Sequence, residues 1–141
     1  MDIRPLSDTY SVTPQIEPED IEAIKAAGFT TVICNRPDGE IPPELQADAM
    51  RGLVEGAGMA FVVNPVIGGA LTQENVDAQR SAIDAASGPV LAYCASGNRS
   101  SIVWALANAG RQPTNELISA GAQYGYQVAQ FRELIDRLAK G

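Results

Sequence analysis

The residues with the clearest chemical potential are Cys94 and Arg99, a cysteine and an arginine separated by four residues. They follow the apolar run Val90 to Tyr93 and precede a helical pattern that begins near Ser101. A cysteine at the turn from a strand into a helix meets unpaired backbone amides and the positive end of the helix dipole. Both favour a thiolate, so we expect Cys94 to be an ionised nucleophile beside an anion held by Arg99.

The residues around this pair form an expected anion cradle. Gly97 permits the left-handed backbone angles that a concave ring of amides requires, and Ser100 offers a hydroxyl to the sulfur or to the helix start. An inert buried cysteine is the alternative, but it does not explain why glycine, arginine and serine follow together. The predicted cradle residues are Ala95, Ser96, Gly97, Asn98 and Ser100.

Three residues at the end of an earlier strand are further candidates. Arg36 would guide an anionic substrate and Asp38 would act as a general acid, although a simple turn over residues 37–39 also explains them. Cys34 would form a disulfide with Cys94 or accept sulfur from it. A core cysteine on an apolar strand is the simpler explanation of Cys34.

The loop from Cys94 to Ser100 resembles the active loop of rhodanese-type sulfurtransferases, which also place four residues between Cys and Arg. Cysteine-dependent phosphatases have five, and their wider ring of amides fits the oxygens of a phosphoryl group. Tyr93 stands where phosphatases carry a histidine, and the stretch 65–70 has no carboxylate to protonate a leaving alkoxide. The loop therefore favours sulfur transfer over phosphoester hydrolysis.

Three functions follow from this loop. The main hypothesis is a sulfurtransferase that moves sulfane sulfur from a small anionic donor, such as thiosulfate or a persulfide, through Cys94 to a thiol acceptor. The alternative is a tyrosine or dual-specificity phosphatase that forms a phosphocysteine, and the third is a non-catalytic persulfide or anion sensor. We expect no cofactor, and a chain without histidine argues against a metal site.

Apolar runs and helical patterns alternate along the chain. The runs at 30–34, 60–64 and 90–93 predict buried strands, and a weaker pattern at 10–12 predicts an edge strand. These elements predict an α/β fold with three layers, a mostly parallel central sheet with helices on both faces. The carboxyl ends of three strands would bring residues 34–38, 64–69 and 94–99 to one mouth. The helix expected from Pro43 would bury Leu45, Ala49, Leu53 and Val54.

Nearly the whole chain resembles the phosphatase-like domain of the beta-lactamase hydrolase-like proteins, in residues 27–40, residues 65–76 and the Cys94 loop. The resemblance implies a fold like that of dual-specificity cysteine phosphatases, bearing a rhodanese-type loop. It also implies a role in sulfide oxidation, with a persulfide dioxygenase as partner. The Asp-x-Arg and Gly-His-Ile motifs of standard rhodanese domains are missing.

Length and charge limit the remaining classes of function. A chain of 141 residues fits one domain, and a net charge of −7 argues against binding nucleic acid or an anionic membrane surface. The chain has two cysteines, no apolar leader and no apolar run long enough to cross a membrane. We therefore expect a cytoplasmic protein, and the sequence indicates no oligomeric state.

Overall fold

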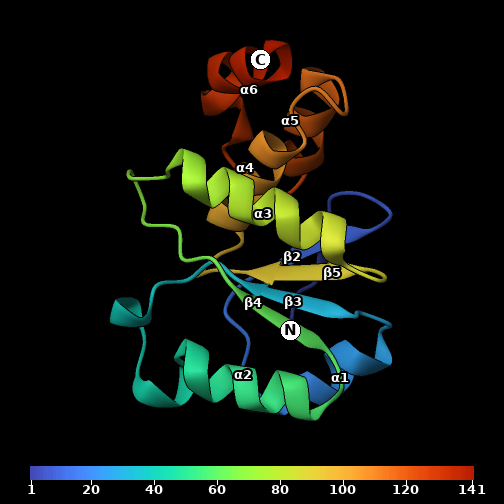
Figure 1. The fold of residues 1–141 in the computed structure, drawn as a ribbon, viewed down its shortest axis with the longest axis vertical. Helices are drawn as coiled ribbons and strands as arrows, with labels where there is room; N and C mark the ends of the chain where they lie inside the picture. Colours follow the sequence, from blue (N-terminus) through green and yellow to red (C-terminus); the bar gives the residue numbers. More distant parts are fainter.

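A computed structural model describes all 141 residues, and a five-stranded sheet lies at its centre (Figure 1). The strand order is β1-β2-β5-β3-β4; β1 pairs with β2 antiparallel, and the other neighbours are parallel. The strands are β1 (Arg4–Pro5), β2 (Tyr10–Thr13), β3 (Thr31–Cys34), β4 (Ala60–Val63) and β5 (Val90–Tyr93). The predicted sheet is confirmed, but β2 is not an edge strand because the short β1 pairs with its outer side.

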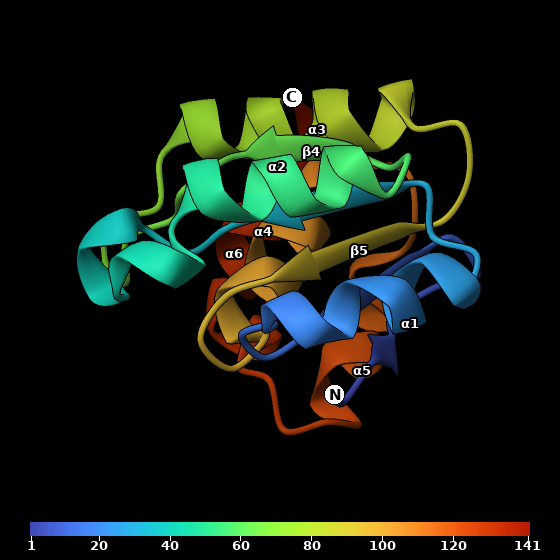
Figure 2. The ribbon, with the colours of Figure 1, turned by 90° about the horizontal axis from the view of Figure 1, so that it is seen from below.

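Helices cover both faces of the sheet, as predicted (Figures 1 and 2). On one face lie α1 (Ile21–Ala26) and α2 (Ala47–Gly56). On the other lie α3 (Gln73–Ala85), α4 (Asn98–Ala107), α5 (Thr114–Ala122) and α6 (Arg132–Lys140). The connecting 3-10 turns are η1 (Pro18–Asp20), η2 (Asp38–Glu40), η3 (Pro43–Leu45) and η4 (Val128–Phe131).

The apolar runs of the central strands supply both cores. Successive side chains of a strand point to opposite faces, so Leu91 packs in the core under α1 and α2 while Ala92 packs in the core under α3 and α4. Val32 and Ile33 divide in the same way on β3. This two-sided burial explains why the runs are apolar throughout and do not alternate.

The helix predicted from Pro43 differs from the structure. The backbone is extended at Gln46, with φ −69° and ψ 163°, so the first turn is the separate η3 and α2 begins at Ala47. Because the helix starts anew at Ala47, its buried side differs from the predicted one, and Ala49 and Leu53 face solvent. The residues that α2 buries are Ala47, Met50 and Val54.

The carboxyl ends of the parallel strands meet on one side of the molecule, where the arrowheads of β4 and β5 point (Figure 2). The loops that follow β3, β4 and β5 therefore form one mouth, which comprises residues 35–40, 64–70 and 94–99. This confirms the expected placement of the three strand ends.

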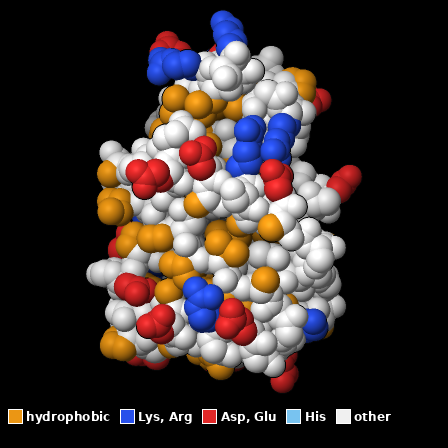
Figure 3. Space-filling model, in the orientation of Figure 1, with side chains coloured by type: hydrophobic (Ala, Val, Ile, Leu, Met, Phe, Trp, Pro, Cys, Tyr) orange, Lys and Arg blue, Asp and Glu red, His pale blue; other side chains and the backbone are white.

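No helix is both long and apolar enough to cross a lipid bilayer. On the face drawn in Figure 3, acidic and basic side chains are scattered, and apolar side chains gather over the sheet edge at β4. This face therefore carries no broad basic surface.

Candidate active site

Cys94 lies directly after β5 and is completely buried. Its Sγ accepts a hydrogen bond from the amide of Gly97 at 3.1 Å. Gly97 has φ +96°, so the predicted left-handed glycine is confirmed, and a Cβ there would lie 2.2 Å from the hydroxyl oxygen of Tyr126. The thiol therefore faces the amides of its own loop.

Four more amides of this loop have no protein acceptor, and they can donate to a bound anion. They belong to Ala95, Ser96, Arg99 and Ser100. Three of the five predicted cradle residues, Ala95, Ser96 and Ser100, thus have amides without an acceptor, and a fourth, Gly97, bonds the sulfur. The last, Asn98, differs because its amide donates to the Ser96 hydroxyl oxygen at 3.2 Å.

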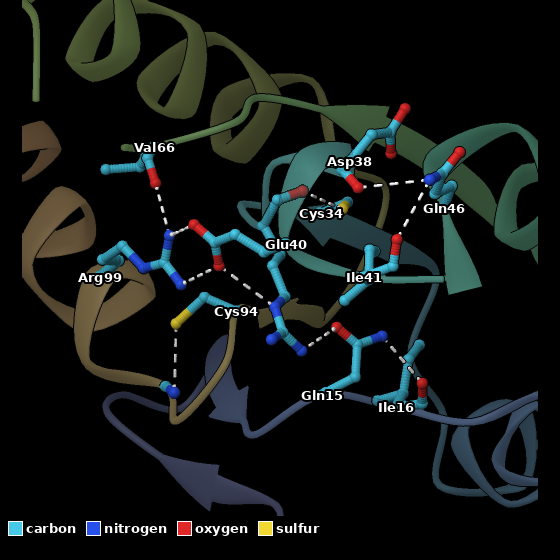
Figure 4. A network of polar contacts seen from close by, with 12 residues as sticks. Gln15, Ile16, Cys34, Asp38, Glu40, Ile41, Gln46, Val66, Cys94 and Arg99 are labelled. Atoms are coloured by element: carbon cyan, nitrogen blue, oxygen red, sulfur yellow. Dashed lines mark hydrogen bonds and ion pairs between the residues drawn. The ribbon is translucent and has the colours of Figure 1, made fainter. Parts of the chain in front are cut away.

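Arg99, in the first turn of α4, reaches across the mouth. Nη1 donates to Glu40 Oε2 and to the carbonyl oxygen of Val66, both at 2.8 Å, and Nη2 donates to Glu40 Oε1 at 2.8 Å (Figure 4). The bonds to Glu40 raise the pKa of Arg99, with a smaller contribution from the charge of Cys94, while burial opposes them. Arg99 is therefore a cation at the mouth into which the Cys94 loop opens, and it already binds a carboxylate.

The carboxylate of Glu40, which the sequence analysis did not single out, lies between two arginines. Its Oε1 also accepts a bond from Arg36 Nε at 3.2 Å. The bond from Arg99 and then that from Arg36 lower the pKa of Glu40, although partial burial raises it. The anion that the Arg99 guanidinium binds in this structure is therefore the protein's own Glu40 carboxylate.

Arg36 and Asp38 have different roles, although they stand two residues apart. Arg36 faces the mouth as predicted, where it bonds Glu40, and it also donates from Nη1 to Gln15 Oε1 at 3.1 Å. Asp38 does not join the site: its Oδ1 accepts the amide of Ala47 at 2.8 Å, at the start of α2. The prediction of Asp38 as the acid is not supported, because its carboxylate anchors a helix and the neighbouring turn delivers Glu40 to the mouth.

A buried polar network supports the Cys94 loop from below. Ser100 Oγ donates to Asn35 Oδ1 at 2.9 Å. The expected bond of this hydroxyl to the sulfur or to the helix start is therefore not formed. Gln79 Oε1 accepts from Asn35 Nδ2 and from Asn64 Nδ2, both at 2.9 Å, and Gln79 Nε2 donates to the Tyr10 hydroxyl oxygen at 2.9 Å. These bonds tie the ends of β3 and β4 to α3 and α4.

A second set of contacts holds the loop from the side. The Tyr126 hydroxyl donates to the carbonyl oxygen of Ser96 and accepts from Arg4 Nη1, both at 2.8 Å. The amide of Gln127 donates to Asn98 Oδ1 at 2.9 Å. The segment 124–127 therefore borders the mouth and also fixes the loop.

Cys34 lies in the core under α1 and α2, and both cysteines of the chain are free thiols. Its Sγ donates to the carbonyl oxygen of Arg36 at 3.4 Å, and burial raises the pKa of this thiol. Tyr93 pairs with Cys34 across the sheet, and its buried hydroxyl has no hydrogen-bond partner. The structure thus supports the simpler explanation of Cys34, a core residue.

The residues that the sequence analysis missed differ in whether the sequence could have revealed them. Gln79 follows Val76 by three residues on the apolar side of α3, so a buried polar group could have been inferred from its helical spacing. Glu40 and Arg4 left none, because their positions depend on turns that bring distant segments together.

The chain matches the family model described as "Beta-lactamase hydrolase-like protein, phosphatase-like domain" over residues 2–111. A beta-lactamase hydrolase-like protein of Xylella fastidiosa is 28% identical over 99% of this chain and 33% of its own length. A second, from Agrobacterium fabrum, is 26% identical over 94% of this chain and 31% of its own length. The chain therefore spans about a third of the length of these relatives.

Solved structures give the same result. A candidate phosphatase of Neisseria meningitidis is 33% identical, with a TM-score of 0.81 over 98% of this chain and 99% of its own. PTPMT1 is 15% identical, with a TM-score of 0.77 over 99% of this chain and 94% of its own, and it supports the fold alone. The cysteine-phosphatase-like fold is thus confirmed.

These findings correct the main functional hypothesis: the prediction of a sulfurtransferase is wrong, and the phosphatase alternative fits better. The error came from judging the anion site by the length of one loop. In the structure the anion site also depends on residues outside that loop, because Glu40 and Arg36 from the segment after β3 meet Arg99 at the mouth. The chain belongs to the family of phosphatase-like domains of the beta-lactamase hydrolase-like proteins.

Proposed function

We propose that this protein is a cysteine-dependent phosphatase that hydrolyses phosphate monoesters through a phosphocysteine at Cys94. The observation that carries the proposal is the bidentate grip of Arg99 on Glu40, with both bonds at 2.8 Å. Carboxylate and phosphate offer an arginine the same pair of oxygens, so a fork that binds one can bind the other. The gripped anion lies beside the nucleophile, where a phosphoryl group must bind.

The reaction begins with an exchange of anions. A phosphate monoester displaces the Glu40 carboxylate from Arg99, and its remaining oxygens take the free amides of the loop. Arg36 retains Glu40 at the edge of the mouth, since its Nε already bonds that carboxylate. The exchange is inexpensive because the Glu40 side chain is 35% exposed and water solvates it when it leaves.

Two displacements at phosphorus follow. The Cys94 thiolate forms a bond to phosphorus as the ester P–O bond breaks, and the alcohol or phenol departs with a proton from solvent. Water then attacks the phosphocysteine, the S–P bond breaks, and inorganic phosphate leaves with the thiolate restored. Arg99 and the loop amides stabilise the negative charge on the equatorial oxygens in both steps.

The test is the hydrolysis of p-nitrophenyl phosphate by the wild type and two cysteine variants. Cys94→Ser removes the nucleophile and should lower kcat at least about a thousandfold. Cys34→Ala is the matched control, because that thiol lies in the core away from the loop amides, and it should keep kcat within about threefold.

An acid quench during turnover should also leave one phosphoryl group on Cys94, detectable by mass spectrometry of the peptide. Hydrolysis that survives Cys94→Ser would contradict the proposal. So would a single labelling of Cys94 without turnover, which is the behaviour expected of an anion sensor.

A further inference from the structure

A cavity of about 250 Å³ opens beside the Arg99 fork. One wall comes from the loop between β4 and α3, and the opposite wall comes from α4 and η4. Its apolar lining consists of Val66, Ile67, Leu71, Ile102 and Phe131. Arg99 also lines it, and no acidic side chain does. We call this cavity the apolar pocket.

The apolar pocket and the anion site share Arg99, and they also share Val66. The carbonyl oxygen of Val66 accepts from Arg99 Nη1, while its residue lines the pocket. A group bound through this guanidinium therefore has the pocket as its immediate neighbour. Ile67 lines the pocket with 59% of its surface exposed, so its side chain is available to a bound group.

We propose that the apolar pocket receives the organic group of the phosphoester, and that the substrates are esters with an uncharged, ring-sized apolar group. This inference rests on the proposed phosphatase function. A cavity of about 150 Å³ with an apolar lining suffices to hold benzene, so the pocket has room for one or two rings. The lining offers a substrate no charge apart from Arg99 itself, which the phosphate uses.

The chemistry of the leaving group favours the same class of substrate. Residues 65–70 carry no carboxylate, and the two arginines beside Glu40 lower its pKa and make it a weak proton donor. A phenol, with a pKa of about 10, leaves as an anion far more readily than an alkyl alcohol, whose hydroxyl is a much weaker acid. The pocket and the missing acid both point to aryl phosphates.

A second cavity borders the loop on its other side and is the competing place for the organic group. It is lined by Arg4, Ser96, Asn98 and the tyrosines Tyr124 and Tyr126, among others. Arg4 is already held there by Asp2 and by the Tyr126 hydroxyl, and the lining lacks aliphatic side chains. An apolar ring would bury less apolar surface in it.

The experiment compares kcat/KM for 2-naphthyl phosphate and phenyl phosphate, two esters whose leaving groups are both phenols. The wild type should prefer the naphthyl ester, and Ile67→Ser should lower the naphthyl-to-phenyl ratio roughly tenfold through lost apolar contact. Leu53→Ser is the matched control, because Leu53 is an exposed aliphatic residue on α2 with 41% of its surface exposed. It should leave the ratio unchanged.

The outcomes separate the two proposals. An unchanged ratio in Ile67→Ser, with turnover that still depends on Cys94, overturns the apolar pocket and leaves the phosphatase intact. A ratio that responds to Tyr124→Leu and not to Ile67→Ser also overturns it, by moving the ring to the second cavity. If the wild type hydrolyses p-nitrophenyl phosphate but neither of these esters, this inference fails and the phosphatase proposal stands; if it hydrolyses none of the three, both fail.

Discussion

The two sides of the mouth are held by different kinds of contact. Under the Cys94 loop, Ser100, Asn35 and Gln79 are completely buried and bonded to one another. Across the mouth, Glu40 stands on a short exposed turn and is held only by its two arginines, with 35% of its side chain exposed. One side is fixed by the interior of the protein and the other by ion pairs in contact with water.

This difference fits two different tasks. Hydrogen bonds between buried groups are costly to break, so they hold the nucleophile and its amides in one geometry. Exposed ion pairs contribute about 0–1 kcal/mol, so a carboxylate held by them can give way to a substrate. We infer that the nucleophile side of the mouth is preorganised and that the Glu40 side adapts.

Arg99 connects the two sides, and its replacement should have the largest effect. Arg99→Lys keeps the charge but removes the fork that binds two oxygens at once. We expect kcat/KM for p-nitrophenyl phosphate to fall about 100- to 1000-fold, the cost of losing one donor at a charged transition state. Arg132→Lys is the control, since that exposed arginine bonds only Asn115. A loss below about tenfold would show that the loop amides bind the phosphoryl group without the fork.

Loss of the buried hydrogen bonds under the Cys94 loop should lower stability as well as activity. Gln79→Met keeps the size of the side chain but removes its bonds to Asn35, Asn64 and Tyr10. We expect the free energy of unfolding in urea to fall by about 2–3 kcal/mol, with a parallel loss of activity. The exposed Gln123→Ala should change it by less than about 0.5 kcal/mol. Equal effects of the two substitutions would remove the basis for a preorganised side.

The contact of Tyr126 with the loop should have a smaller effect. Tyr126→Phe removes the bond to the carbonyl oxygen of Ser96 together with the bond from Arg4 Nη1, and it leaves the ring in place. We expect kcat to fall about fivefold, because only the bond to Ser96 acts on the loop, with KM little changed because the hydroxyl does not touch substrate. Tyr124→Phe is the matched control, because its hydroxyl donates to the carbonyl oxygen of Pro5 and not to the loop. Equal losses in the two variants would argue against a positioning role.

The sequence predicted the fold well, because the fold depends on local patterns. Apolar runs such as 90–93 are buried on both faces whatever surrounds them, and Thr72 caps α3 through its own side chain. The buried face of α2 was not predictable from spacing alone, because the extended backbone at Gln46 resets the helical phase. Tertiary contacts set that break, and the helical period does not encode it.

The two sides of the mouth also differ in how well their residues could be predicted from the sequence. Cys94, Gly97 and Arg99 were predictable because one short loop contains them all. Glu40 was not, because its role depends on a contact across 59 residues with Arg99. The choice of chemistry failed for the same reason, since residues outside the loop complete the anion site.

Removal of the Glu40 charge should have the smallest effect of these substitutions, and it should strengthen anion binding where the others weaken function. In Glu40→Gln the Arg99 fork loses its resident anion, so sulfate should bind about threefold more tightly near neutral pH, a modest gain because the pair is exposed. Calorimetric titration with sulfate measures this directly. Glu44→Gln, an exposed glutamate on η3, should leave the affinity unchanged. Weaker binding of sulfate to Glu40→Gln would contradict displacement and would mean that Glu40 mainly aligns the arginine.

The pH dependence separates these two roles further, because sulfate keeps its charge while Glu40 titrates. The pKa of Glu40 is lowered by Arg99 and Arg36, so the carboxylate competes for the fork at all pH values above that lowered pKa. As the pH falls below the ordinary glutamate pKa of about 4.3 and through the lowered pKa, Glu40 takes up a proton and sulfate affinity should rise in the wild type. The stability from the same ion pairs should be lost in that window, since it is present only while Glu40 is ionised. In Glu40→Gln the rise in affinity should vanish, because the variant has no group to titrate at the fork. A rise that persists in the variant would assign the competition to a different carboxylate and would leave Glu40 as a fixed part of the site.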